Sequence, residues 1–140
     1  MEIQHKLQKH GELMNLEEYF KKTAGRGVLA TADADGKVDI AYYARPHVID
    51  SETVALIMND RRSHNNITEN PCAAYLFTAQ SPENDSSLNG VRLYLTMINE
   101  ERDTERLYKL KRRAVNNSDE TRYLVFFHVE TIRPLVGDGD

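Results

Sequence analysis

Apolar and polar residues alternate along several short stretches of this chain, as expected for strands that bury one face. The clearest stretch is 38–48, where Ile40, Tyr42 and Ala44 lie on one side. The other side carries Asp39, Ala41, Tyr43 and Arg45. Further strands are predicted at 27–32, 53–58, 72–78, 92–98 and 123–132. The turn at 33–36 contains Asp35-Gly36, so the first two strands form a hairpin.

Three helices are predicted between these strands. One covers 15–25, because Asn15 can cap it, Glu18 completes a capping box and Gly25 can end it. A short helix at 63–69 is stopped by Asn70-Pro71. A third helix, at 101–114, is charged and amphipathic, with Leu107 and Leu110 facing inward.

Six evenly spaced strands, with helices inserted rather than alternating with them, favour a mainly β fold, a six-stranded antiparallel barrel. The length of 140 residues, with 40% hydrophobic and 29% charged side chains, is typical of one globular domain. We therefore expect a single domain over 1–140, with an N-terminal extension at 1–14 and an acidic tail at 133–140. The polar stretch 80–90 is expected to be a mobile loop.

Charge and cysteine content exclude several classes of function. The net charge is −4, and each half of the chain has nine basic and eleven acidic residues, so neither half is a nucleic-acid module. Cys72 is the only cysteine and falls in a strand predicted to be buried. No signal-like or membrane-spanning apolar run occurs, so we expect a cytoplasmic protein without a membrane partner. No histidine has the helical partner spacing of a metal site, so none is predicted.

Four segments can be compared with known families by their order and spacing. They are Gly27-Val28-Leu29-Ala30-Thr31, Asp35-Gly36, Arg61-Arg62-Ser63 and Ile67-Thr68-Glu69-Asn70-Pro71. In this order and spacing they resemble the FMN-binding split β-barrel family related to pyridoxamine 5'-phosphate oxidase. The resemblance covers residues 15–132. It implies an FMN-binding split-barrel architecture, an FMN cofactor, and a homodimer with the flavin at the subunit interface.

The resemblance also implies where the flavin phosphate is held. Counting back from Asn70-Pro71 places the family's phosphate-binding positions on Arg62 and Ser63, and Arg61 and His64 are further candidates. A helix start and a guanidinium group suit a phosphate on physical grounds alone. The alternative is that Arg61 and Arg62 form a surface pair and that Ser63 is only a helix cap.

In this family the isoalloxazine ring lies against the second strand and the end of the third, which implies contacts with Ala41, Tyr42, Tyr43, Met58 and Asn59. Several relatives carry a polar or basic side chain where Ala41 stands, so backbone groups would matter more here. Tyr42 and Tyr43 have a simpler interpretation as packing residues. Because neighbouring strand residues point to opposite sides, one of the two must face the barrel interior.

The leading functional hypothesis is an FMN-dependent oxidoreductase, because the flavin carries its own chemistry and no other catalytic motif is present. True pyridoxamine-phosphate oxidases are longer and end in an Arg-Leu-x-Pro-like segment, so vitamin B6 oxidation is disfavoured. The alternatives are a non-enzymatic FMN carrier or electron-transfer protein and a haem-binding protein, for which only His64 and His128 are candidate ligands.

Candidate dimer contacts are the second-strand tyrosines with Tyr123, Phe126 and Phe127. The substrate and redox partner stay unknown.

Overall fold

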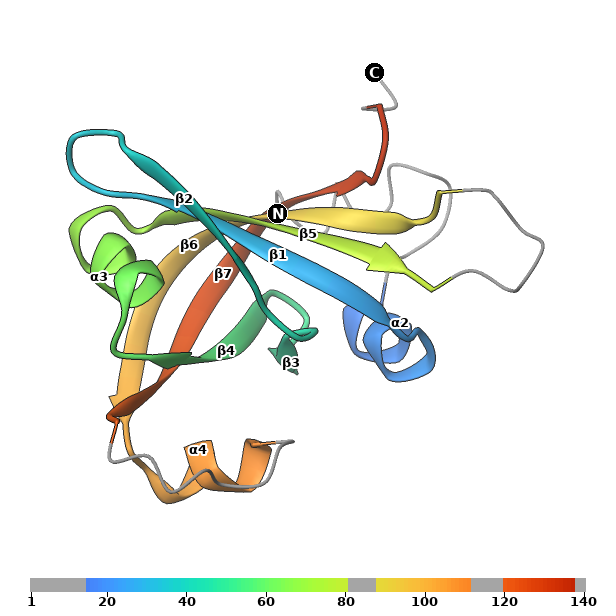
Figure 1. Ribbon diagram of the computed structural model, residues 1–140. Helices are drawn as coiled ribbons and strands as arrows, with labels where there is room; N and C mark the ends of the chain where they lie inside the picture. Colours follow the sequence, from blue (N-terminus) through green and yellow to red (C-terminus); the bar gives the residue numbers. More distant parts are fainter. Residues whose placement is uncertain (1–14, 81–87, 112–119, 138–140) are drawn as a thin grey trace.

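One antiparallel sheet organises the computed structural model, which describes residues 15–80, 88–111 and 120–137 (Figure 1). In the described residues the sheet has seven strands in the order β2-β1-β5-β6-β7-β4-β3. The strands are β1 (Gly25–Ala32), β2 (Val38–Tyr42), β3 (His47–Asp50), β4 (Thr53–Asn59), β5 (Cys72–Ala79), β6 (Gly90–Arg102) and β7 (Arg122–Pro134). The helices are α2 (Leu16–Lys22), α3 (Arg62–Glu69) and α4 (Glu105–Leu110). The predicted antiparallel barrel fold is confirmed, with one strand more than expected.

The additional strand arises because the stretch 38–48 is not continuous. β2 pairs with β1 at one edge of the sheet, and β3 pairs with β4 at the other edge. Residues 43–46, which we call the crossing segment, connect the two edges. Pro46 lies in it, and proline has no N–H to donate to a sheet ladder, so the strand cannot run on into β3. The single predicted strand was wrong for this reason.

The crossing segment is attached to the sheet through the backbone of Tyr43. The Tyr43 N–H donates to the Gly27 carbonyl at 3.0 Å. The Tyr75 hydroxyl donates to the Tyr43 carbonyl at 3.1 Å. Both partners belong to β1 and β5, two neighbouring strands in the interior of the sheet, so these hydrogen bonds fix the position of the segment against them.

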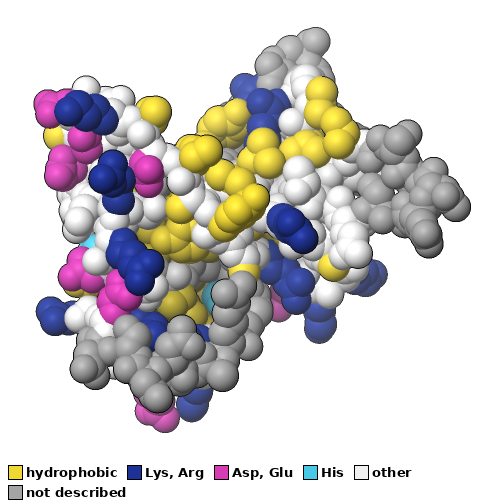
Figure 2. Space-filling model, in the orientation of Figure 1, with side chains coloured by type: hydrophobic (Ala, Val, Ile, Leu, Met, Phe, Trp, Pro, Cys, Tyr) yellow, Lys and Arg dark blue, Asp and Glu magenta, His cyan; other side chains and the backbone are white. Residues whose placement is uncertain are grey.

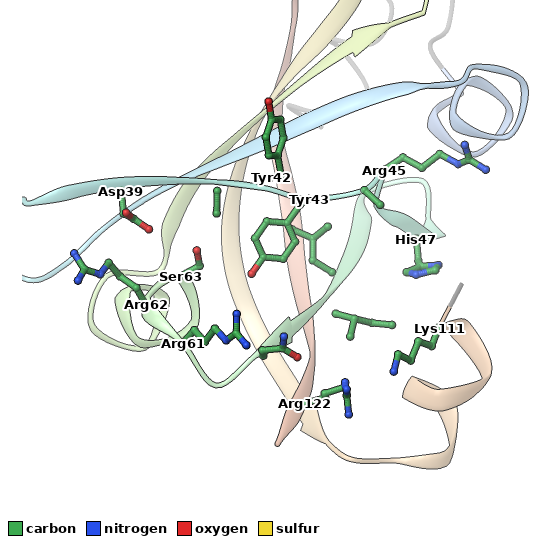
Figure 3. A pocket seen from close by; sticks show the side chains of 15 residues that line it. Asp39, Tyr42, Tyr43, Arg45, His47, Arg61, Arg62, Ser63, Lys111 and Arg122 are labelled. Atoms are coloured by element: carbon green, nitrogen blue, oxygen red, sulfur yellow. The ribbon is translucent and has the colours of Figure 1, made fainter. Parts of the chain in front are cut away.

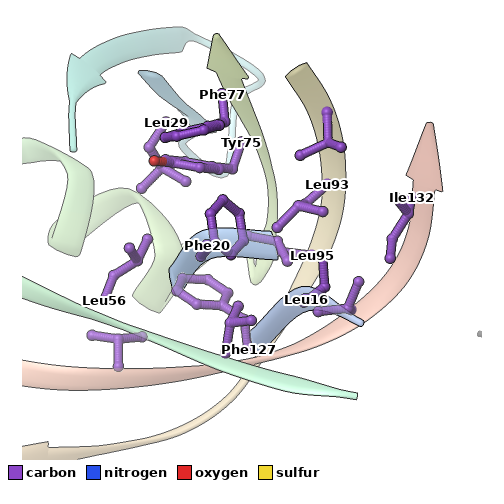
Figure 4. Packing of buried hydrophobic residues seen from close by; sticks show 14 of the residues in the cluster. Leu16, Phe20, Leu29, Leu56, Tyr75, Phe77, Leu93, Leu95, Phe127 and Ile132 are labelled. Carbon is purple, nitrogen blue, oxygen red and sulfur yellow. The ribbon is translucent and has the colours of Figure 1, made fainter. Parts of the chain in front are cut away.

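The core lies inside the curled sheet and is closed at one end by α2 (Figure 4). Leu16 and Phe20 point from α2 into it, and the Phe20 ring meets the Phe77 ring edge to face at a centroid distance of 5.1 Å. A smaller cluster forms where Leu107 of α4 packs against Ala55, Leu124 and Phe126. Burial of these apolar side chains provides the main stabilisation of the fold.

The helix boundaries follow the caps more closely than the amphipathic pattern. Asn15 accepts a hydrogen bond from the Glu18 N–H at 3.0 Å, as predicted, but α2 ends at Lys22 and Gly25 begins β1. α4 begins only at Glu105, after its cap Thr104, because residues 101–102 continue β6. Leu107 is buried and Leu110 half-buried, as expected. No helix in the described residues is long and apolar enough to cross a membrane.

Other expectations also change. Cys72 is exposed rather than buried. Arg133 and Pro134, assigned to the tail, are the last residues of β7. Phe126 and Phe127, suggested as dimer contacts, are 5% and 0% exposed and therefore belong to the core of one chain. The extension 1–14, most of the loop 80–90 and the end of the predicted third helix lie outside the described residues.

Replacing Gly27 by alanine tests the packing under the crossing segment. A Cβ at Gly27 would overlap the Tyr75 hydroxyl and the adjacent ring carbon. We expect Gly27→Ala to lower the free energy of unfolding by about 1–3 kcal/mol, as overpacking does in a close-packed core. Tyr75→Phe should lower it by about 0.5–1.5 kcal/mol, the contribution of one hydrogen bond. Urea denaturation measures both, and an unchanged midpoint for Gly27→Ala would contradict the packing argument.

Titrating His128 should change stability in a defined direction. Its Nδ1 lies 3.0 Å from Glu130 and its Nε2 3.2 Å from Glu52, and the hydrogen bond with Glu130, followed by that with Glu52, raises the His128 pKa. A raised pKa contributes stability that is present below the unfolded value of 6.5 and is lost as the pH rises through the folded value. His128→Gln should therefore be less stable than the wild type near about pH 5.5, by about 0.2–1 kcal/mol. The difference should disappear by about pH 9. A difference independent of pH would contradict the charged pair.

Candidate functional site

A cavity of about 680 Å³ opens between the crossing segment, the end of β4, the start of α3 and the end of α4 (Figure 3). Its volume is within the range of ~300–1,000 Å³ typical of small-molecule sites. The lining residues are Asp39, Ala41, Tyr42, Tyr43, Ala44, Arg45, His47, Leu56, Ile57, Asn59, Arg61, Arg62, Ser63, Lys111 and Arg122. The cavity is therefore lined by the crossing segment together with elements far apart in the sequence.

Seven of the nine residues proposed from the sequence line this cavity. They are Ala41, Tyr42, Tyr43, Asn59, Arg61, Arg62 and Ser63. They come from three separate elements, β2 with the crossing segment, the end of β4, and the start of α3. The structure thus brings into one cavity the residues that the resemblance implies for the ring and for the phosphate.

The start of α3 differs from the starts of the other two described helices. Asn15 caps α2 and Thr104 caps α4 with a side-chain oxygen, and both helices carry a glutamate in the first turn. α3 has Arg61 at its N-cap, no side-chain cap and no acidic residue in the first turn. Its free N–H groups and positive dipole end lie beside the cavity, where an anion would be stabilised. Ser63 is the second residue of the helix, so the interpretation of Ser63 as a plain cap was wrong.

The two arginines at this helix start have different surroundings. Arg61 donates from Nε and Nη2 to the Glu120 carboxylate at 2.7 and 2.9 Å, and this fork lowers the Glu120 pKa. Arg62 is exposed and makes no ion pair with a described carboxylate. Of the two, Arg62 has the guanidinium that is available to an incoming anion.

Tyr43 points into the cavity, whereas Tyr42 points away from it (Figure 3). Tyr42 is 80% exposed, and Tyr43 is half-buried against the core, so the predicted division between the two tyrosines is confirmed. Burial raises the pKa of Tyr43, and a hydrogen bond with the Ser63 side chain partly opposes this shift. The phenol therefore stays protonated at neutral pH and can donate a hydrogen bond.

Met58 and His64 do not line the cavity. Met58 alternates with its neighbours Ile57 and Asn59, which face the cavity, so its side chain lies in the core. The His64 ring is buried, stacks on Tyr123 at a centroid distance of 3.7 Å, and places Nε2 2.6 Å from the Glu100 carboxylate. The His64 ring is thus directed toward Glu100 and Tyr123 and is absent from the cavity lining.

The candidate haem ligands are also directed elsewhere. His64 belongs to the buried pair with Glu100, and both ring nitrogens of His128 are bonded to carboxylates. In the described residues, no three His, Cys, Asp or Glu side chains are grouped to hold a metal ion.

Sequence reasoning missed several cavity residues. Asp39 and Arg45 could have been found, because they share the strand face of Ala41 and Tyr43. Arg122 could not, because its place follows from the pairing of Asn59 with Arg122 between β4 and β7. Lys111 falls in the charged helix predicted at 101–114, for which only Leu107 and Leu110 were expected to face inward, yet it lines the cavity.

The cavity is far more basic than the chain as a whole. It is lined by five of the 18 basic residues but by only one of the 22 acidic residues, Asp39. In a chain with a net charge of −4, this distribution concentrates positive potential in one concave site. The cavity is thus suited to an anionic ligand.

Known structures share this architecture. No protein-family model matches the sequence, and no curated protein is similar enough to count as a relative. An FMN-binding protein of Syntrophomonas wolfei subsp. wolfei superposes with a TM-score of 0.70 at 21% identity, over 87% of this chain and 84% of that chain. HupZ of Group A Streptococcus gives 0.61 at 21% identity, over 86% and 90%. A candidate pyridoxamine 5'-phosphate oxidase of Lactobacillus delbrueckii gives 0.57 at 18% identity, over 86% and 93%.

These matches span most of each chain, and their identities are low enough that they show the fold alone. The protein has the split β-barrel fold of FMN-binding and pyridoxamine 5'-phosphate oxidase-like proteins.

Proposed function

We propose that this protein binds FMN in the cavity and acts as an FMN-dependent oxidoreductase. The observation that carries the proposal is the uncapped start of α3, which opens with Arg62 and Ser63 onto a basic cavity of suitable size. A phosphate there would replace the missing cap, accept hydrogen bonds from the free N–H groups and pair with the Arg62 guanidinium. The fold shared with an FMN-binding protein supports the same assignment.

The remaining cavity residues fit the ring system of a flavin. Ala41 has a small side chain, which leaves the β2 backbone accessible, and Tyr43 offers a flat half-buried ring beside it. Asn59, at the end of β4, can donate and accept hydrogen bonds at a ring edge. When bound, FMN supplies hydride or electron transfer, and these residues orient it and shield it from water.

An enzyme and a carrier differ in a measurable way. Rapid steady-state turnover of a reduced nicotinamide with an acceptor supports the oxidoreductase. Reduction only by a partner protein supports the alternative, an FMN carrier or electron-transfer protein. We keep the cytoplasmic location as part of the proposal, because a single exposed cysteine suits a reducing compartment.

We also propose that the protein is a homodimer with the flavin near the interface. Val38, Ile40 and Tyr42 on the outer face of β2 are 81%, 70% and 80% exposed. Strand pairing extends this apolar row across β1 to Leu76 of β5. Hydrophobic side chains also gather across the centre of the face seen in Figure 2. Such a patch favours association, and Tyr42 borders the cavity as well, so a second copy over β2 would cover the flavin site.

The phosphate placement is tested with Arg62→Ala. Removing one guanidinium deletes a charge-assisted contact worth ~1.5–3 kcal/mol, so FMN affinity should fall by about 10- to 100-fold. Riboflavin, which has no phosphate, should bind wild type and variant alike. Fluorescence titration at fixed ionic strength measures both ligands, with Arg26→Ala, an exposed β1 arginine outside the cavity, as the control. FMN binding as tight in Arg62→Ala as in the wild type would place the phosphate elsewhere.

The dimer is tested by placing a charge on the outer face of β2. Ile40→Asp should convert the dimer to a monomer, because an unpaired carboxylate would be buried at the interface. Val136→Asp is the matched control, since Val136 is 65% exposed but lies outside β2. Light scattering measures both variants. A monomeric wild type with FMN bound would refute the dimer.

A further inference from the structure

The cavity has a second group of cations on the side of α4. Lys111 directly follows α4, and Arg122 is the first residue of β7. Both side chains point toward the same end of the cavity, on the side of α4 (Figure 3). Pairing of Asn59 with Arg122 fixes this end relative to β4.

Two carboxylates close to Arg122, those of Asp103 and Glu120, make their hydrogen bonds with groups other than the Arg122 guanidinium. Asp103 Oδ1 accepts hydrogen bonds from the Arg122 backbone N–H at 3.1 Å and from the Tyr108 hydroxyl at 3.0 Å. Glu120 is held in the bidentate pair with Arg61. Within the part of the chain that the structure describes, neither Lys111 nor Arg122 has a side-chain ion pair.

Leaving these two cations together is unfavourable. Arg122 is only 7% exposed, and the nearby carboxylate that its charge acts on, Glu120, is shared with Arg61, so the lost hydration of Arg122 is only partly compensated. Desolvation, together with the charge of Arg122, lowers the pKa of Lys111. An anion between the two side chains would remove the repulsion and form charge-assisted hydrogen bonds with both.

FMN has one phosphate, so it cannot neutralise both ends of the cavity. We propose that Lys111 and Arg122 form a second anion subsite, which binds the phosphate or carboxylate group of an organic anion that is the second redox substrate. The proposal rests on the proposed function, in which the phosphate of FMN occupies the Arg62 end. A substrate anchored at this subsite would extend toward the flavin ring, which the proposed function places beside Tyr43 and Asn59.

The test measures binding of inorganic phosphate and of succinate, separately, to the FMN-loaded protein by calorimetry. We expect the wild type to bind at least one of the two with a dissociation constant on the order of 1 mM, and the better ligand identifies the anionic group. Lys111→Gln and Arg122→Gln should each weaken that binding by about tenfold. Lys109→Gln is the matched control, because Lys109 lies on the same helix but pairs with Glu105 on the surface, and it should bind as the wild type does.

Several outcomes overturn the proposal. The proposal is refuted if the FMN-loaded wild type binds neither anion, or if both glutamine variants bind as tightly as the wild type. Lys111→Gln decides the test if Arg122→Gln, which alters a buried residue, fails to fold.

The same titrations on the FMN-free protein separate this inference from the proposed function. If the protein binds phosphate through Lys111 and Arg122 but does not bind FMN at all, only the proposed flavin site is refuted. If FMN itself displaces the phosphate held by Lys111 and Arg122, that end belongs to the cofactor and the second subsite is refuted.

Discussion

The site depends on one attachment, the backbone of Tyr43 held between the Gly27 carbonyl and the Tyr75 hydroxyl. These two hydrogen bonds fix the crossing segment where the chain leaves one sheet edge for the other. They also direct the Tyr43 ring inward, where it meets Ser63 at the start of α3. Gly27 is required at this point because a side chain there would occupy the space of the Tyr75 hydroxyl.

Local patterns predicted most of the elements because local interactions determine them. Alternation located the strands, and Asn15 located the start of α2. The position of Arg62 and Ser63 beside a short helix also followed from nearby residues, since Asn70-Pro71 ends that helix. These parts of the fold and of the candidate site could be predicted because each depends on residues within about one helix or strand length.

The parts that failed depend on residues far apart in the sequence. Nothing local shows that β2 and β3 lie at opposite edges, although Pro46 gives a reason for the break between them. The orientation of His64 follows from Glu100 and Tyr123, which come from β6 and β7. Arg122 reaches Asn59 only through the pairing of β4 with β7, and Lys111 follows a helix that the pairing of β6 with β7 places, so the sequence did not indicate that both line the cavity.

That pairing also determines when the cavity can form during folding. Asn59 and Arg122 are neighbours in the sheet, but 62 residues separate them along the chain. Closing so long a loop is slow, and a chain emerging from the ribosome completes β1, β2 and α3 well before β7 exists. Until β7 docks, one edge of β4 stays unpaired and the cavity lacks one wall. The nascent chain therefore acquires a complete cavity only after β7 has been synthesised and has paired with β4.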